Sequence, residues 1–248
     1  MVPENWPVAT AHDPRRLEEA RHQVHSLVQW LARIERSYGS QGNGAMPTLE
    51  WHNARNAITT HPLGRDLDLE LRLPELVLQF REGGEAVSHP LHVEEHSPAH
   101  VEAWLLVELL HRGMDRERFS KALPYDVSGL MSGDAVEFSP EAYENELRVL
   151  TAWFSNAASV IARTIDKSQP EQKQTVTVRP DDLSLEAGAS GDRILGFRTG
   201  RAELPEPFFY IRRGQGGSAA GAGESVLPVS QIPAHGGEDR VAQFLKEA

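Results

Sequence analysis

The sequence predicts an α+β protein in which antiparallel sheet packs against helices. Three observations support this prediction. Residues 13–38 carry apolar side chains at spacings of three and four, which is typical of an amphipathic helix. Residues 67–73 alternate leucine with charged side chains, which is the period of a half-buried strand. Four short apolar segments between residues 174 and 213, separated by Pro, Gly and Asp, are typical of further strands.

Composition excludes several classes of protein. The chain has 248 residues, of which 40% are hydrophobic, so a single domain spanning 1–248 with a sizeable core is expected. The net charge is −11 and no long basic stripe occurs, which disfavours nucleic acid and anionic membranes as partners. The absence of cysteine excludes disulfides and thiolate metal sites. No apolar run of membrane-spanning length and no secretory signal are visible, so we expect a cytoplasmic protein without a membrane span or a cofactor.

Local signals fix the ends of the predicted elements in the first half. Asp13 and Pro14 begin the first helix, because an aspartate caps free N–H groups and proline suits the first helical position. After a glycine-rich loop at 39–47, the strand at 67–73 is followed by an antiparallel partner at 76–80. Residues 86–93 are predicted to form a third strand at an edge, because Pro90 cannot donate to a ladder.

The second half repeats this order. Helices are predicted at 97–113, beginning with a Ser-Pro pair and ending at a glycine, and from Ser139 to Ile165. Strands follow at 174–213, then one at 225–229 and a closing helix from Gly237. Residues 67–83 resemble 183–200, and 96–106 loosely resemble 232–245. One interpretation is an internal duplication of a helix–meander–helix unit, with repeats at 12–114 and 139–248; the alternative is an α+β domain that alternates without duplication.

The stretch His92–His96 spells H-x-x-E-H, a pattern found in one class of zinc peptidases. A helical site needs both histidines one turn apart, but Ser97 and Pro98 mark a helix that begins after them. His92, Glu94 and His96 are therefore expected in extended or turn backbone, on one face if the strand continues that far. A metal there would need a third ligand, and His61, His89 and Glu95 are near in sequence only. His92 and His96 are thus candidates for a metal site, and the other interpretation is that they are surface or half-buried histidines.

Other catalytic and binding motifs receive little support. No G-x-S-x-G nucleophile elbow occurs, and adjacent carboxylates such as Asp181 and Asp182 are typical of a solvated surface. The glycine-rich stretch at 214–223 lacks the Lys-Ser/Thr pair and the helix of a phosphate-binding loop, so it is interpreted as an ordinary loop.

The aromatic residues indicate a candidate ligand pocket. In the strand at 207–213, Phe208 and Tyr210 are expected on one face and Phe209 on the other. The side chains of one face are expected to pack into the core, and those of the other face to line something less buried. A pocket lined by Trp51, His61, His92 and Tyr210 is one hypothesis, and plain core or edge packing is the other.

Several segments resemble, in the same order, an uncharacterised and mainly bacterial family, the domain of unknown function 5996. They include "EWHN", "ITTHPLGRDLDLELRLPELVLQFREGG", "HSPAHVEAWLLVELLHRGM", "ILGFRTG" and "PEPFFYIRR", and together with the segments around 139–161 and 224–245 they span most of the chain. The chain departs from the family after its long helix, where "VTVRPDDLSLEA" replaces an aromatic strand. The resemblance implies a compact cytoplasmic α+β protein and brings no known reaction, ligand or catalytic residue.

The sequence therefore predicts non-catalytic binding of a small molecule or of another protein, through a cavity, a strand edge or the aromatic strand. The alternative is a metal-dependent enzyme that uses His92 and His96 with a third ligand. Whether the protein is an enzyme, and in which oligomeric state it exists, both stay open at this stage.

Overall fold

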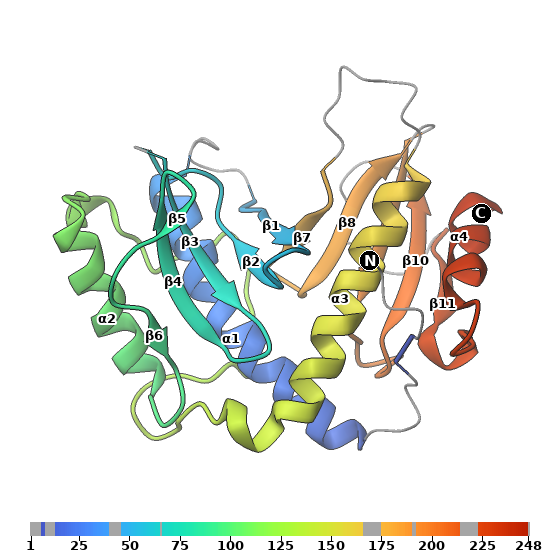
Figure 1. Cartoon of the computed structure of the whole chain (residues 1–248), viewed down its shortest axis with the longest axis horizontal. Helices are drawn as coiled ribbons and strands as arrows, with labels where there is room; N and C mark the ends of the chain where they lie inside the picture. The colour runs from blue at the N-terminus through green and yellow to red at the C-terminus, as the bar shows by residue number, and fades with distance from the viewer. Residues whose placement is uncertain are drawn as a thin grey trace.

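A computed structural model gives the fold of the chain (Figure 1), and it describes residues 6–7, 13–39, 46–64, 66–165, 175–189, 192–213 and 223–247. The predicted glycine-rich loops lie largely outside these residues, at 40–45 and 214–222. Four α-helices and three short 3-10 helices occur in the described parts. They are α1 (Pro14–Tyr38), α2 (Pro98–His111), η2 (Arg116–Arg118), η3 (Pro140–Tyr143), α3 (Glu144–Thr164), η4 (Val229–Gln231) and α4 (Gly237–Glu247).

Eleven strands of the described residues form one antiparallel sheet, which confirms the α+β prediction. The first six are β1 (Leu49–His52), β2 (Ala57–Thr59), β3 (Leu67–Arg72), β4 (Val77–Glu82), β5 (Glu85–Ala86) and β6 (Leu91–His92). The other five are β7 (Thr177–Arg179), β8 (Ser184–Ala189), β9 (Arg193–Arg198), β10 (Phe208–Arg213) and β11 (Ser225–Pro228).

The sheet consists of two meanders that meet in its middle. Its strand order is β11-β10-β9-β8-β7-β1-β2-β3-β4-β5, with β6 also paired to β4, so that β1 and β7 join the two parts. A long helix precedes each meander and a shorter helix follows it. The order helix, meander, helix therefore occurs twice, whereas an origin by duplication stays a prediction.

One of the two sequence similarities does not follow this structural repeat. Residues 67–83 hold the third and fourth strands of their meander, whereas 183–200 hold the second and third strands of theirs. The weaker similarity does follow it, because β6 leads into α2 as β11 leads through η4 towards α4. Each of these two strands also pairs with the fourth strand of its own meander.

The helix starts follow the local rules that the sequence displays. The Asp13 carboxylate accepts a hydrogen bond from the backbone N–H of Arg15 at 2.9 Å, and Pro14 is the first residue of α1. Ser97 caps α2 in the same way, with Pro98 as its first residue. At Ser139 the prediction is off by one turn, because η3 precedes α3 and Ser139 makes no capping bond.

The prediction of one continuous strand at 86–93 is wrong. Only β5 and β6 form, and residues 87–90 between them are irregular. His89 lies in the left-handed region with φ 68°, and Pro90 has no N–H to donate. Together they interrupt the ladder, so the edge of the sheet consists of two short strands.

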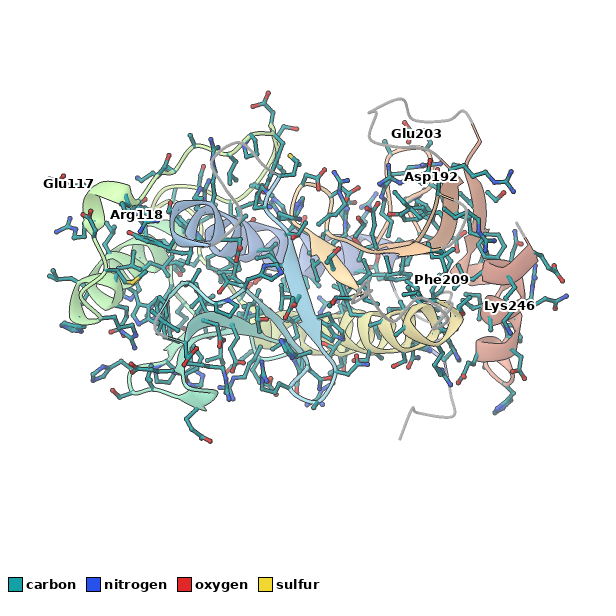
Figure 2. All side chains as sticks on the ribbon, turned by 90° about the horizontal axis from the view of Figure 1, so that it is seen from above. Glu117, Arg118, Asp192, Glu203, Phe209 and Lys246 are labelled. Atoms are coloured by element: carbon teal, nitrogen blue, oxygen red, sulfur yellow. The ribbon has the colours of Figure 1, made fainter. Side chains whose placement is uncertain are left out.

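Register shows which side chains share a face of the sheet. Leu49 pairs with Val178, Val178 with Leu185, Leu185 with Phe197, and Phe197 with Phe209, so all five lie on one face. That face packs against α3, since the ring centroids of Phe154 and Phe197 are 6.2 Å apart. Figure 2 shows Phe209 in the interior, whereas Glu117 and Lys246 mark opposite ends of the molecule.

The two long helices lie on opposite sides in the view of Figure 1, with α1 behind the β1–β4 part of the sheet and α3 in front of β8. Contacts agree with this view, because α1 lies against β1 and β3 and α3 against β8 and β9. A sheet of this many strands accumulates a large twist, which turns its two halves relative to each other. None of the described helices has the length and hydropathy needed to span a membrane.

Candidate functional site

A cleft of about 610 Å³ runs along one side of α3. Its other wall is formed by the β1–β2 turn and by Pro74 in the β3–β4 turn. The lining residues are small or polar, with a single charged side chain among them. They are Asn53, Ala54, Asn56, Pro74, Arg148, Thr151, Ala152, Ser155, Asn156 and Ser159.

The helical repeat explains why α3 presents these residues together. Positions 148, 151, 152, 155, 156 and 159 follow spacings of three and four, so they share one side of the helix. Trp153 and Phe154 project from other sides and are buried in the core. The helix therefore separates its large apolar side chains from a strip of hydroxyl and amide groups.

The β1–β2 turn is fixed against this strip by hydrogen bonds. Asn53 donates from Nδ2 to Ser159 Oγ at 2.9 Å, and Ser155 Oγ donates to Asn56 Oδ1 at 3.3 Å. Asn56 has φ 49°, a left-handed conformation that asparagine tolerates better than most residues. The Trp51 indole N–H donates to Asn53 Oδ1 at 2.5 Å. The wall of the cleft is thus tied both to α3 and to the core.

Asn156 is the unusual residue of the cleft. It is 1% exposed, and neither atom of its carboxamide has a hydrogen-bond partner within the part of the chain that the structure describes. A buried polar group without a partner costs about 1–3 kcal/mol, and such groups are rare in folded proteins. A carboxamide offers donors and an acceptor side by side, so it matches a ligand group with the same pair.

The cleft is close to electrically neutral. Arg148 is the one ionised residue that lines it in the described part of the chain, and it donates to Glu144 one turn earlier on α3, at 2.5 Å from Nη2. This hydrogen bond raises the pKa of Arg148, and the pair lies in solvent at the end of the cleft.

The structure does not bring the four residues of the predicted pocket together. Trp51 lies on the same face as Phe209, with its ring centroid 5.3 Å from that of Phe154, whereas Tyr210 projects from the opposite face. One pocket therefore cannot hold both. The alternation of Phe208 and Tyr210 against Phe209 is as predicted, but the expectation of a less buried pair is wrong, because both faces of β10 are covered.

Tyr210 belongs to a buried polar network. Its hydroxyl donates to Glu186 Oε1 at 2.5 Å, and Arg212 donates to both oxygens of the same carboxylate at 2.8 and 3.0 Å. Burial raises the pKa of the Tyr210 phenol well above its usual value, and Glu186 adds to the rise. The hydroxyl stays protonated, so its role is a structural hydrogen bond.

His61 pairs with α1 rather than with a ligand. Its Nδ1 lies 3.2 Å from Glu35 Oε1, and its backbone N–H donates to Glu35 Oε2 at 2.8 Å. This carboxylate, 1% exposed, raises the pKa of His61. His92 is exposed at the end of β6 and lines a separate acidic hollow of about 260 Å³ together with Glu94. The two histidines thus occupy different sites.

The H-x-x-E-H pattern has neither the helical nor the strand geometry that would place its two histidines side by side. Its helical form is excluded as predicted, because α2 begins at Pro98. A strand form fails too: β6 ends at His92, and Glu95 turns the chain with φ 58°. His96 stacks on His100, with centroids 4.0 Å apart. Within the described residues, neither His92 nor His96 belongs to a group of three side chains close enough to share a metal.

Sequence reasoning missed the residues that form the cleft. Asn53 and Asn56 could have been found as a turn signal between two short strands. Asn156 gave no signal, since an isolated asparagine in a helix is common on surfaces, whereas this one is 1% exposed.

Comparisons with known proteins identified no similar protein. No family model, no curated protein and no solved structure matches the chain. The resemblance to the domain of unknown function 5996 therefore stays a prediction, and the candidate site rests on the geometry of this chain.

Proposed function

We propose that this protein binds a small, uncharged polar molecule in the cleft along α3. One observation carries the proposal: Asn156 lines the cleft, and its buried carboxamide has no hydrogen-bond partner among the described residues. A ligand with a neighbouring donor and acceptor, such as a polyol, a primary amide or the edge of a nucleobase, would satisfy both atoms.

The rest of the cleft supports binding rather than catalysis. Among the described residues, its lining contains no histidine, carboxylate or lysine that could act as a general acid or base. Within the described ranges, Ser155 and Ser159 have no basic side chain as a hydrogen-bond partner. Ser155 donates to Asn56, and Ser159 donates to a helix carbonyl. Nucleophilic chemistry needs such a base. A volume of about 610 Å³ lies within the range of small-molecule sites.

The test is a thermal-shift screen of the full chain with polyols, primary amides and nucleosides, followed by calorimetry on any compound that raises Tm. The informative variant is Asn156→Leu, which keeps the approximate volume and removes the carboxamide. Asn145→Leu is the matched control, because Asn145 is an exposed residue of the same helix that does not line the cleft.

The proposal expects the wild type and Asn145→Leu to bind, and Asn156→Leu to lose affinity by at least tenfold. Removing an unpaired buried amide should leave the Tm of the free protein unchanged or higher. Binding that is equal in Asn156→Leu and the wild type would refute the role of the cleft, as would the absence of any hit. A large fall in the Tm of free Asn156→Leu would instead show that the carboxamide has a structural partner.

A further inference from the structure

A second group of side chains lies outside the cleft, around the C-terminal end of α2. His89, Glu108 and His111 each offer one donor atom, and these atoms lie within 4.8 Å of one another. Nδ1 of His111 is 3.6 Å from Glu108 Oε1, and Nδ1 of His89 is 3.9 Å from the same oxygen. Two imidazole nitrogens and one carboxylate oxygen are a donor set that Zn²⁺ uses in catalytic sites.

Two of the three residues come together through helix geometry. Glu108 and His111 are three residues apart on α2, so their side chains share one side of the helix. Glu108 is only 3% exposed, and a buried carboxylate needs partners. Arg112 supplies one: it contacts Glu108 Oε2 and donates to the Glu108 carbonyl at 3.0 Å. Oε1 is thereby left facing the two histidines.

Arg112 is itself fixed, so the carboxylate it holds has a defined direction. Its guanidinium lies 4.5 Å from the centroid of Phe80, a buried ring of β4. A group that orients a ligand from behind is a recurrent feature of metal sites. The charge of Arg112 is balanced by Glu108, so the group is neutral when both histidines are unprotonated.

The third residue, His89, is held in place by an independent and unfavourable backbone conformation. It has φ 68°, and the left-handed region costs a non-glycine residue about 1–2 kcal/mol. The Trp104 indole N–H, also on α2, donates to the His89 carbonyl at 3.2 Å. Such strained positions persist where neighbours enforce them, and they cluster at ligand sites.

We propose that His89, Glu108 and His111 bind Zn²⁺ or a similar first-row divalent cation. With Zn–N distances of about 2.0–2.1 Å, donors of a tetrahedral site lie about 3.4 Å apart. The present spacing, at most 4.8 Å, needs a contraction of up to about 1.4 Å. The exposed His89 and His111 side chains can supply it, at 69% and 59% exposure. The nitrogen donors favour zinc over calcium or magnesium.

The proposed site leaves at least one coordination position open. His111 and Arg112 also line a hollow of about 410 Å³ with Gly64, Leu67 and Glu82. A water molecule or an exogenous donor could therefore reach a cation held by the three residues. An open position distinguishes this arrangement from a closed structural zinc site, which has four protein ligands.

The test is calorimetric titration of ZnCl₂ into the full chain, without a histidine tag and after treatment with a chelator, at pH 7.5. His89→Ala and His111→Ala remove one donor each, and both residues are exposed, so the fold should survive. Glu108→Gln keeps the shape and the contact to Arg112. The matched control is His96→Ala combined with His100→Ala, which removes two stacked histidines from the start of the same helix region.

We expect one equivalent of zinc in the wild type and in the control, with affinity at least tenfold weaker in each of the three donor variants. Co²⁺ in place of Zn²⁺ should give a visible absorption band that His89→Ala lacks. Unchanged circular dichroism spectra would show that the variants are folded. Zinc affinity that is equal in His89→Ala and the wild type would overturn the proposal, and so would wild-type binding with a dissociation constant weaker than about 100 μM.

Discussion

The contact between Gly196 and Tyr210 gives the sharpest stability prediction. The two residues face each other across β9 and β10, and the ring of Tyr210 covers the position where a side chain at 196 would start. A Cβ added there would lie 2.6 Å from Cε1 of Tyr210 and 2.5 Å from its hydroxyl oxygen, against an ordinary contact of 3.4–4 Å. Gly196→Ala therefore forces the ring to move by roughly 1 Å in a close-packed layer.

The cost has two parts. Overpacking of a core costs about 1–3 kcal/mol. The ring cannot move freely, because its hydroxyl is bonded to the buried carboxylate of Glu186 at 2.5 Å, and a hydrogen bond to a charged group contributes about 1.5–3 kcal/mol. We expect a loss of about 3 kcal/mol in the free energy of unfolding, which lowers Tm by about 6–12 °C in a chain of this size.

Urea denaturation at pH 7 measures this loss as a lower midpoint with an unchanged slope. Gly188→Ala is the matched control. Gly188 lies on the same face of the neighbouring strand β8, and a Cβ added there meets nothing within 4 Å. It should change stability by less than about 1 kcal/mol. If Gly196→Ala and Gly188→Ala unfold within about 0.5 kcal/mol of each other, the packing argument is wrong.

Three further predictions concern charged and capping groups. Hydrogen bonding to Glu35 raises the pKa of His61. The contribution of His61 to stability is therefore full below about pH 6.5 and is lost as pH rises through the folded pKa. His61→Gln should make the urea midpoint depend less on pH between pH 6 and 9. Burial lowers the pKa of His25, whose Nε2 donates to the Pro180 carbonyl at 2.9 Å. The contribution of His25 to stability is therefore present above about pH 6.5 and is lost as pH falls through the folded pKa. His25→Gln should reduce the loss of stability in acid, and an unchanged urea midpoint at acid pH would contradict this. Asp13→Ala should cost about 1 kcal/mol through the lost cap of α1, measurable as a lower midpoint relative to the wild type.

Much of the fold could be predicted because its signals are local. A capping residue followed by proline placed the starts of α1 and α2, and strict alternation placed β3. The single sheet could not be predicted, because it depends on the pairing of β1 with β7, two short strands from distant parts of the chain. Strands of three or four residues carry too few alternating positions to be recognised by period.

The candidate cleft could not be predicted from the sequence either, because it depends on contacts between distant parts of the chain. Thr151, Ser155 and Asn156 form a polar strip that, by helical spacing alone, is indistinguishable from a solvated helix face. The β1–β2 turn, which reaches α3 through Asn53, converts that strip into the wall of a cleft, and Asn156 within the strip is buried. Burial of a polar group without a partner is thus a tertiary property, and its meaning appears only after the fold is known.

The proposed zinc site uses other histidines than the two of the H-x-x-E-H motif. A motif carries its chemistry only if the local structure it requires is present, and the turn at Glu95 separates His92 from His96. The position of the His89 side chain could not be foreseen, because a residue before proline is expected in extended backbone, yet His89 is left-handed. That conformation, with the Trp104 bond to its carbonyl, brings the imidazole towards Glu108. The zinc titration of His89→Ala therefore tests whether this strained backbone serves metal binding.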